Sequence, residues 1–82
     1  MAARYEDIER WVYSAKEKEC THLIVVCDTY DHDDYPCYVS KDEDIHERIK
    51  HFKHADMQRI MEVYNMSMDL KTQLKEHRAY NI

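Results

Sequence analysis

Apolar residues recur at two different spacings along the chain, and the change of spacing marks the expected elements. Between residues 4 and 19 they return every three or four positions, which predicts an amphipathic helix. Residues 21–27 form a short β-branched run that is apolar on both faces, as expected for a central strand covered on two sides. The helical stripe consists of Tyr5, Ile8, Trp11, Val12 and Ala15.

A polar segment, residues 28–35, follows this strand and precedes Pro36. Residues 37–39 predict a second short strand, so that the two strands form a hairpin with a long connection. Because proline lacks a backbone N–H, Pro36 is expected at the start of its strand or on a sheet edge. Ser40 and Glu43 have the spacing of a capping box, which predicts that a helix opens there and runs to about residue 53.

Residues 57–66 fit two secondary structures, because their apolar residues fall on a helical stripe that the residues downstream do not continue. One straight helix would carry two competing apolar faces. We predict a strand over about 59–66, then a helix that is capped at Ser67 or Asp69 and ends near residue 79. The alternative is an entirely helical 57–79. The two competing stripes are Met57, Ile60, Met61 and Tyr64, against Val63, Met66, Leu70, Leu74 and His77.

These elements predict one small α+β domain, residues 1–82, with the order α-β-β-α-β-α. Its sheet is short, three-stranded and mainly antiparallel, and it packs against helices. If residues 57–79 were helical, the fold would be a hairpin with three helices. A chain of 82 residues has room for one modest core, which disfavours a deep substrate cavity and favours binding or regulation over catalysis.

Charge and composition narrow the possible functions. The net charge is −5 and Lys and Arg are outnumbered 12 to 17 by Asp and Glu, which disfavours direct binding to nucleic acid and allows a protein partner with a basic surface. The chain has no glycine. This excludes the glycine-rich phosphate-binding loops, in which the backbone approaches the phosphate without a Cβ.

The cellular setting follows from three further features. The longest apolar run, Leu23–Cys27, is too short to span a membrane, and no signal peptide is recognisable. Three cysteines form an odd set without a CxxC pair, which favours reduced thiols over a disulfide framework. We therefore expect a cytoplasmic protein that does not associate with membranes.

The most distinctive segment is acidic. Four aspartates lie within seven residues, beside His32 and between two tyrosines. Three interpretations remain open: a solvated turn whose aspartates bond their own backbone, a protein-binding tip, and a divalent-metal site. An EF-hand is excluded, because the positions that need glycine and glutamate hold other residues. The candidate partner-binding residues are Asp28, Tyr30, Asp31, Asp33, Asp34 and Tyr35.

Cysteine and histidine residues offer weaker candidates for chemistry. A zinc site from Cys20, His22, Cys27, His32 and Cys37 lacks the usual ligand spacing. A cysteine nucleophile paired with a histidine lacks any local signature, and His51 and His54 lie beside lysines that repel cations. We therefore predict no catalytic residue, no metal and no cofactor. The methionines between 57 and 68 favour core packing, with a homodimer interface as the alternative.

Several segments resemble a group of small proteins found in phage and bacterial genomes. They are Thr21–Thr29 (THLIVVCDT), Asp33–Val39 (DDYPCYV), Met61–Asp69 and Gln73–Arg78. The resemblance implies no catalytic or ligand residues. It implies a role in phage biology, in which small acidic proteins bind and block host factors, including defence nucleases with basic grooves. The leading hypothesis is thus a non-catalytic, acidic interaction module, with a small metal-binding domain as the alternative.

Overall fold

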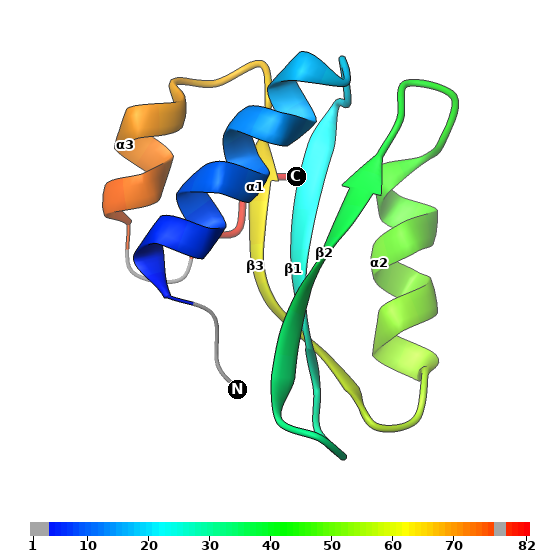
Figure 1. Cartoon of the computed structure of the whole chain (residues 1–82). Coiled ribbons are helices and arrows are strands. Elements are labelled where there is room, and N and C mark those ends of the chain that lie inside the picture. Colours follow the sequence, from blue (N-terminus) through cyan, green and yellow to red (C-terminus); the bar gives the residue numbers. More distant parts are fainter. Residues whose placement is uncertain (1–3, 77–78) are drawn as a thin grey trace.

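The structure, a computed structural model, describes residues 4–76 and 79–82 and has three layers (Figure 1). A three-stranded antiparallel sheet in the order β2-β1-β3 lies in the middle, with α1 and α3 on one face and α2 on the other. This confirms the predicted α+β fold and its element order. The elements are α1 (Tyr5–Glu17), β1 (His22–Asp28), β2 (Asp33–Val39), α2 (Ile45–His54), β3 (Gln58–Asn65) and α3 (Leu70–Lys75).

The central strand β1 is apolar on both faces because each face builds a separate core. Leu23 and Val25 pack into the cluster formed with α1 and α3, whereas Ile24 and Val26 pack into the cluster formed with α2. All four side chains are buried. The prediction of a strand covered on two sides is confirmed.

The ambiguous segment is a strand, β3, so the entirely helical alternative is wrong. Its register to β1 shifts by one residue, since Val25 pairs with Glu62 while Val26 pairs with Ile60. The extra residue, Met61, forms a bulge. Because of this bulge, Met61 packs against the α1 side and Ile60 against the α2 side. The bulge interrupts the regular alternation that would otherwise identify a strand.

The hairpin between β1 and β2 is tighter than predicted. Both strands extend into the acidic segment, with Asp28 ending β1 and Asp33 beginning β2, so only residues 29–32 form the connection. The long loop over 28–35 was therefore a wrong prediction. The backbone pairing of the two strands continues into this segment, with Asp34 opposite Cys27 and Asp33 opposite Asp28. The acidic composition had suggested a loop, but these backbone hydrogen bonds form whatever the charge of the side chains.

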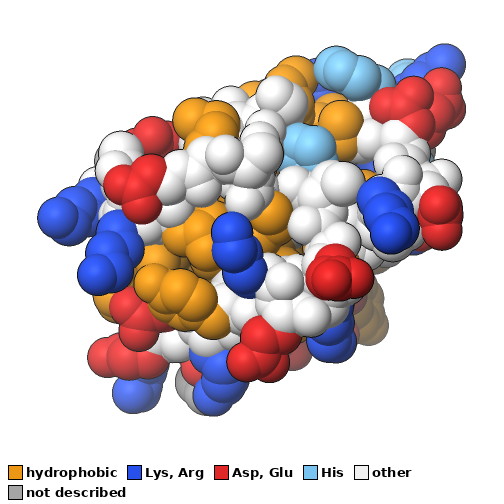
Figure 2. Space-filling model, turned by 90° about the horizontal axis from the view of Figure 1, so that it is seen from above, with side chains coloured by type: hydrophobic (Ala, Val, Ile, Leu, Met, Phe, Trp, Pro, Cys, Tyr) orange, Lys and Arg blue, Asp and Glu red, His pale blue; other side chains and the backbone are white. Residues whose placement is uncertain are grey.

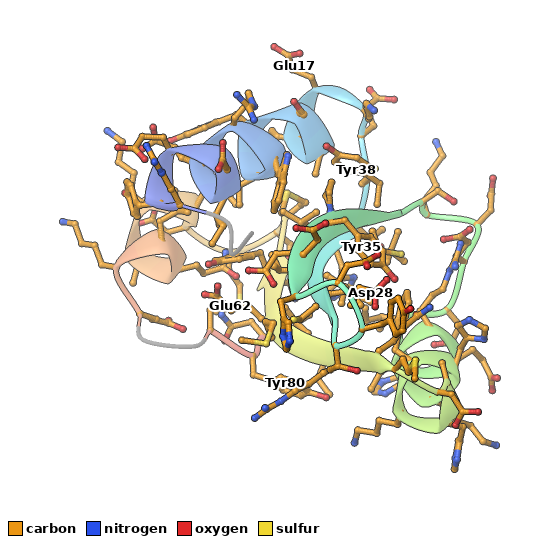
Figure 3. All side chains as sticks on the ribbon, turned by 60° about the horizontal axis from the view of Figure 1, so that its bottom comes forward. Glu17, Asp28, Tyr35, Tyr38, Glu62 and Tyr80 are labelled. Carbon is orange, nitrogen blue, oxygen red and sulfur yellow. The ribbon has the colours of Figure 1, made fainter. Side chains whose placement is uncertain are left out.

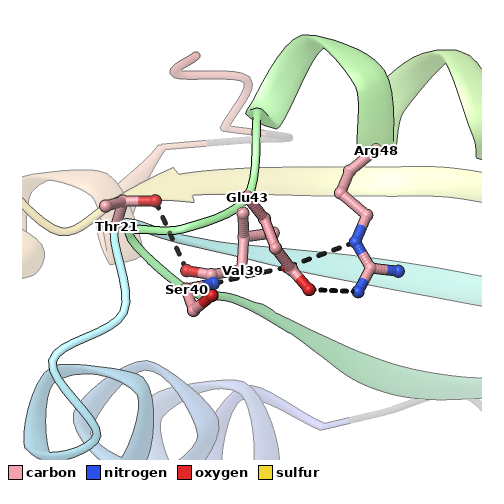
Figure 4. Close-up of polar contacts among 5 residues, drawn as sticks. All are labelled: Thr21, Val39, Ser40, Glu43 and Arg48. Atoms are coloured by element: carbon pink, nitrogen blue, oxygen red, sulfur yellow. Dashed lines mark hydrogen bonds and ion pairs between the residues drawn. The ribbon is translucent and has the colours of Figure 1, made fainter.

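The second helix begins later than the capping box suggested. The Ser40 N–H does donate to the Glu43 carboxylate at 3.4 Å, but this contact closes a turn, and the cap of α2 is Asp44, which accepts from the His46 N–H at 2.9 Å. Glu43 is also held by Arg48, with Nη2–Oε1 at 2.7 Å (Figure 4). This charge-assisted bond holds the pKa of Glu43 below its ordinary value.

The last helix is shorter than predicted. It begins after Asp69, one of the two predicted caps, whose side chain accepts from the Lys71 N–H. It ends at Lys75, whereas the sequence suggested residue 79. The predicted continuation through residues 77–78, which includes His77, lies outside the described residues.

The outer edge of β3 is covered by two unlike groups. The Val63 N–H donates to the Ala79 carbonyl at 2.8 Å, and Val63 O accepts from the Asn81 N–H at 3.0 Å. Asn65 is the next residue of β3 whose backbone N–H and C=O point away from β1. The fully buried Gln73 side chain accepts from the Asn65 N–H at 2.7 Å and donates to Asn65 O at 2.8 Å. One amide side chain thus takes the place of a neighbouring strand.

The edge strand β2 contains Pro36, opposite Val25. The backbone N–H and C=O of Val63 bond to residues 79 and 81 and so point away from β1. Ile24, which lies opposite Val63, therefore bonds to β2 through its own N–H and C=O. Because these groups alternate in direction along a strand, those of the next residue, Val25, point toward β3. The ring nitrogen of Pro36 therefore points away from β1. The predicted edge position is confirmed, and no ladder bond is lost.

The end of the sheet where β1 begins is called the closed end and comprises Thr21, Val39, Asn65, Met66 and Gln73. Thr21 bridges both outer strands, because its N–H donates to Val39 O at 2.8 Å and its carbonyl accepts from the Met66 N–H at 2.9 Å. Figure 2 looks onto this end and shows hydrophobic side chains at its centre, with lysines, arginines and carboxylates around the rim. Within residues 4–76 and 79–82, no helix has the length and apolarity needed to cross a membrane.

Candidate functional site

The candidate site is the opposite end of the sheet, here called the hairpin tip: residues 28–34 and the neighbouring turn at 55–57. The two turns are joined where the Thr29 N–H donates to the Met57 carbonyl at 2.9 Å. Figure 3 brings this end forward and shows Asp28 and Tyr35 beside the end of the hairpin. Segments that are about 25 residues apart in the sequence therefore present one surface.

Asp28 shapes the turn through its carboxylate. One oxygen accepts from the Tyr30 N–H at 2.9 Å and from the Asp31 N–H at 3.5 Å. This is the aspartate-to-backbone bonding expected of a solvated acidic turn. The Asp28 carboxylate thus has a structural role in addition to its charge.

Two residues of the hairpin tip adopt a backbone conformation that usually requires glycine. His32 has φ 58° and Met57 has φ 60°, both in the left-handed region that disfavours residues with a Cβ. Because the chain contains no glycine, a residue with a Cβ adopts this conformation in each turn, at a cost in backbone strain.

The ladder places acidic side chains close together. Asp28 lies directly opposite Asp33 on the same face of the hairpin, and like charges in this position destabilise a strand pair. Asp34 lies opposite Cys27 and shares a hydrogen bond with its thiol, while Arg59 lies opposite Cys27 on the other side. A cation therefore lies in the same cross-strand row as Asp34, which reduces the net charge of that row.

The two tyrosines that flank the acidic segment have different surroundings. Tyr30 is 73% exposed, the largest value among the large hydrophobic residues described as exposed, and Met57 in the adjoining turn is 58% exposed. Tyr35 packs against the α2-side cluster, and its hydroxyl donates to Gln58 Oε1 at 3.1 Å. Burial raises the pKa of Tyr35. Tyr30 is thus available for contact, whereas Tyr35 serves mainly the core.

None of the three free thiols has the surroundings of an activated nucleophile. Burial raises the pKa of Cys20, Cys27 and Cys37 above the ordinary value of 9.0. At Cys27 the hydrogen bond to Asp34 adds to this rise. A reactive cysteine needs a lowered pKa, so the structure gives no support to a cysteine enzyme.

The structure does not bring the imagined zinc ligands together. Cys20 packs with the α1-side cluster, whereas Cys37 packs with the α2-side cluster on the opposite face of the sheet. Over the part of the chain that the structure describes, no group of three or more His, Cys, Asp or Glu side chains is placed to hold a metal ion. The metal-binding alternative gains no geometric support.

His22 has a distinctive position at the closed end. Thr21 Oγ1 donates to Val39 O at 3.3 Å, so the contact of 3.0 Å between His22 Nδ1 and Thr21 Oγ1 requires that Nδ1 carries the proton. Among the described residues, the buried Nε2 has no hydrogen-bond partner. Burial, and then the nearby His46, lower the pKa of His22.

The described residues also form two shallow hollows, one at the closed end and one that adjoins the hairpin tip at Ala55. One, of about 440 Å³, opens at the closed end beside Cys20, His22 and Met66. The other, of about 360 Å³, is on the exposed side of α2 and is lined by Glu47, Lys50, His51, His54 and Ala55. His51 and His54 thus do face a common space, as their spacing of three residues suggests.

Searches for relatives leave the site to be interpreted from its own chemistry. No protein-family model, no curated protein and no solved structure matches the chain significantly. The resemblance to small phage and bacterial proteins therefore stays a prediction.

Sequence reasoning identified four aspartates and Tyr30 but missed Met57 as part of the same surface. Met57 lies in a different turn, and only the hydrogen bond from Thr29 shows that the two turns are neighbours. The residues just after α2 offered one signal: Asp56 and Met57 are a charged and an apolar residue in a short turn between a helix and a strand.

Proposed function

We propose that the chain is a non-catalytic protein-interaction module whose hairpin tip binds a basic surface on another protein. The observation that carries this proposal is Tyr30, which is 73% exposed among four aspartates. A tyrosine combines a large contact area with low conformational entropy, and such residues are enriched at the centres of interfaces. The aspartates would speed and orient the encounter with a cationic partner.

The energetics of the hairpin tip support the proposal. Asp28 opposite Asp33, and positive φ at His32 and Met57, all lower the stability of the fold. Strain and like-charge contacts of this kind are concentrated at functional sites.

A narrower hypothesis is that the module is a phage-encoded inhibitor of a host or defence protein. It rests on the resemblance of segments such as THLIVVCDT to small phage and bacterial proteins, together with the negative charge that would suit a basic nucleic-acid groove. The proposal of a basic protein partner does not depend on it.

Two matched variants test the role of the hairpin tip. In the first, Asp31, Asp33 and Asp34 are all changed to Asn; in the second, the exposed Glu6, Glu17 and Glu19 of the α1 region are all changed to Gln, which alters the net charge by the same amount. Basic proteins captured from a cell lysate by each immobilised variant are identified and quantified by mass spectrometry.

We expect the aspartate variant to lose partners that the glutamate variant keeps. Tyr30→Ala should weaken the same partners, whereas Tyr13→Ala, which removes another exposed tyrosine, should not. Equal losses in the two charge variants would show that net charge alone governs capture, and would contradict the assignment of the hairpin tip.

A further inference from the structure

The helix α2 carries the opposite charge from the hairpin tip. It contains Arg48, Lys50 and Lys53 but one carboxylate, Glu47, in a chain whose net charge is −5. Arg48 is paired with Glu43, so Lys50 and Lys53 supply the positive charge that the helix presents. It also contains His46, His51 and His54, three of the six histidines. The helix is therefore a cationic region on an acidic protein.

The exposed side of this helix is hollowed. The hollow of about 360 Å³ follows two turns of α2, from Glu47 to Ala55, and is lined by Lys50, His51 and His54. An ammonium group and imidazole rings attract the face of an aromatic ring. The hollow therefore has the size and chemistry to take a tyrosine side chain.

The cationic hollow and the acidic hairpin tip adjoin. Ala55 lines the hollow and is the first residue of the turn at 55–57, which receives the hydrogen bond from Thr29. Figure 1 shows α2 ending at the same end of the molecule as the hairpin, and Figure 3 shows nitrogen-tipped side chains around α2 next to the Asp28 and Tyr35 region. One end of the molecule therefore carries an exposed tyrosine with acids, and beside them a cationic hollow.

We propose that this end is self-complementary, so that two copies of the chain pair about a two-fold axis. In this pairing, Tyr30 of each copy enters the α2 hollow of the other, and the aspartates of each hairpin tip approach the opposing Lys50 and Lys53. A two-fold interface uses the same surface twice, so its two halves must be neighbours on each copy, as they are here. The proposal rests on the hairpin tip being a contact surface and adds α2 as its counterpart.

A second copy fits this end better than an anionic polymer does. Glu47 lies within the hollow, and the aspartates adjoin it, so a phosphate backbone would meet like charge at both places. A protein surface with separate acidic and basic parts meets opposite charge at both. Pairing would cover Tyr30, so self-association would compete with a basic partner for the hairpin tip.

Charge reversal tests the pairing without knowledge of any other ligand. The tip-reversed variant carries Asp31→Lys and Asp33→Lys, and the helix-reversed variant carries Lys50→Glu and Lys53→Glu. Sedimentation velocity over a range of protein concentrations, at low and high salt, measures the dimerisation of each variant and of an equimolar mixture. Circular dichroism confirms that each variant is folded.

We expect a concentration-dependent dimer of the natural chain that weakens with salt, and dimerisation roughly tenfold or more weaker in each variant alone. The mixture should recover the dimer, because the reversed tip then meets the reversed helix while the unaltered tip meets the unaltered helix. Tyr30→Ala should weaken the dimer as well. A control with Lys16→Glu and Lys71→Glu, on elements away from α2, should behave as the natural chain does.

Three results would overturn the pairing: a natural chain that stays monomeric at every concentration, a mixture that does not recover the dimer, or growth into larger assemblies without a dimer endpoint. The helix-reversed variant separates this outcome from the proposed function, since its hairpin tip is unaltered and should still capture basic proteins. If that capture persists while no dimer forms, the pairing fails and the proposed function stands.

Discussion

The two ends of the sheet differ in how far their backbone groups are hydrogen-bonded and their side chains buried. At the closed end, Thr21 bonds to both outer strands, and Gln73 pairs with the backbone of Asn65 although no strand lies beside it. At the hairpin tip, Tyr30 and Met57 are 73% and 58% exposed. The backbone pairing of one end is completed by the chain itself, whereas the other end leaves contact area to solvent.

This difference indicates which part of a small domain can be used as a binding surface. An 82-residue chain has few apolar side chains to spare, and it uses them in two cores, one on each face of β1. Like charges are tolerated at the hairpin tip, where side chains are exposed and solvent screens them. A surface that carries no part of either core is the one free to serve recognition.

The largest expected effect is at the closed end. Gln73→Leu replaces the amide with an apolar side chain of similar size and leaves the Asn65 N–H and C=O without their partner, so we expect the free energy of unfolding to fall by about 3 kcal/mol. Urea unfolding followed by circular dichroism measures it. Lys71→Ala, at an exposed position of the same helix, is the control and should change stability by less than about 0.5 kcal/mol.

A loss below about 1 kcal/mol for Gln73→Leu would mean that the Asn65 backbone finds water instead. The contrast between a closed and an open end would then disappear.

A smaller gain is expected at the hairpin tip. His32→Gly and Met57→Gly relieve the positive φ and should each raise the free energy of unfolding by about 0.5–1 kcal/mol. Glu19, with φ 58° just after α1, should respond in the same way. Asp31→Gly is the control, because its φ is not in the left-handed region; there glycine only adds entropy to the unfolded chain and should destabilise. Thermal and urea unfolding measure the stability of each variant. Destabilisation by Met57→Gly would show that the Met57 side chain holds this turn in place.

The smallest effect concerns acid and again the closed end. Because His22 has a lowered pKa in the folded state, the unfolded chain binds its proton more readily, so the stability present above pH 6.5 should decline as the pH falls below that value. His22→Gln should flatten the decline in urea midpoints between pH 7.5 and 5. His54→Gln, which removes an exposed imidazole, should leave the decline unchanged, and identical profiles for both variants would refute the role of His22.

Most of the fold was predictable because the apolar pattern of β1 and α1 reports burial directly. The strand β3 could be inferred only from the conflict between two helical stripes, since the bulge at Met61 hides its alternation. The start of α2 could not be fixed, because Ser40 with Glu43 and Asp44 with His46 are both plausible caps. In the structure the cap is Asp44, and Arg48 holds Glu43 in the turn before the helix.

The candidate site was predictable in part. Charge density located Asp28, Asp31, Asp33 and Asp34, but composition could not show that the strands continue among them. Tyr30 and Tyr35 differ because Tyr30 lies in the connection at residues 29–32, whereas Tyr35 lies in β2. The sequence could not show this difference before the bounds of the hairpin were known. Met57 and the α2 hollow depend on tertiary contacts that no local pattern reports.

The placement of Pro36 has a consequence for how crowded copies of this chain behave. The outer side of β2 would otherwise offer a regular row of amide hydrogens to any passing extended segment, the first step toward fibrils. With its middle amide replaced by a ring, a stacking strand would lose a bond at the centre of the row. Concentrated solutions should therefore resist amyloid formation, and association should proceed through side chains.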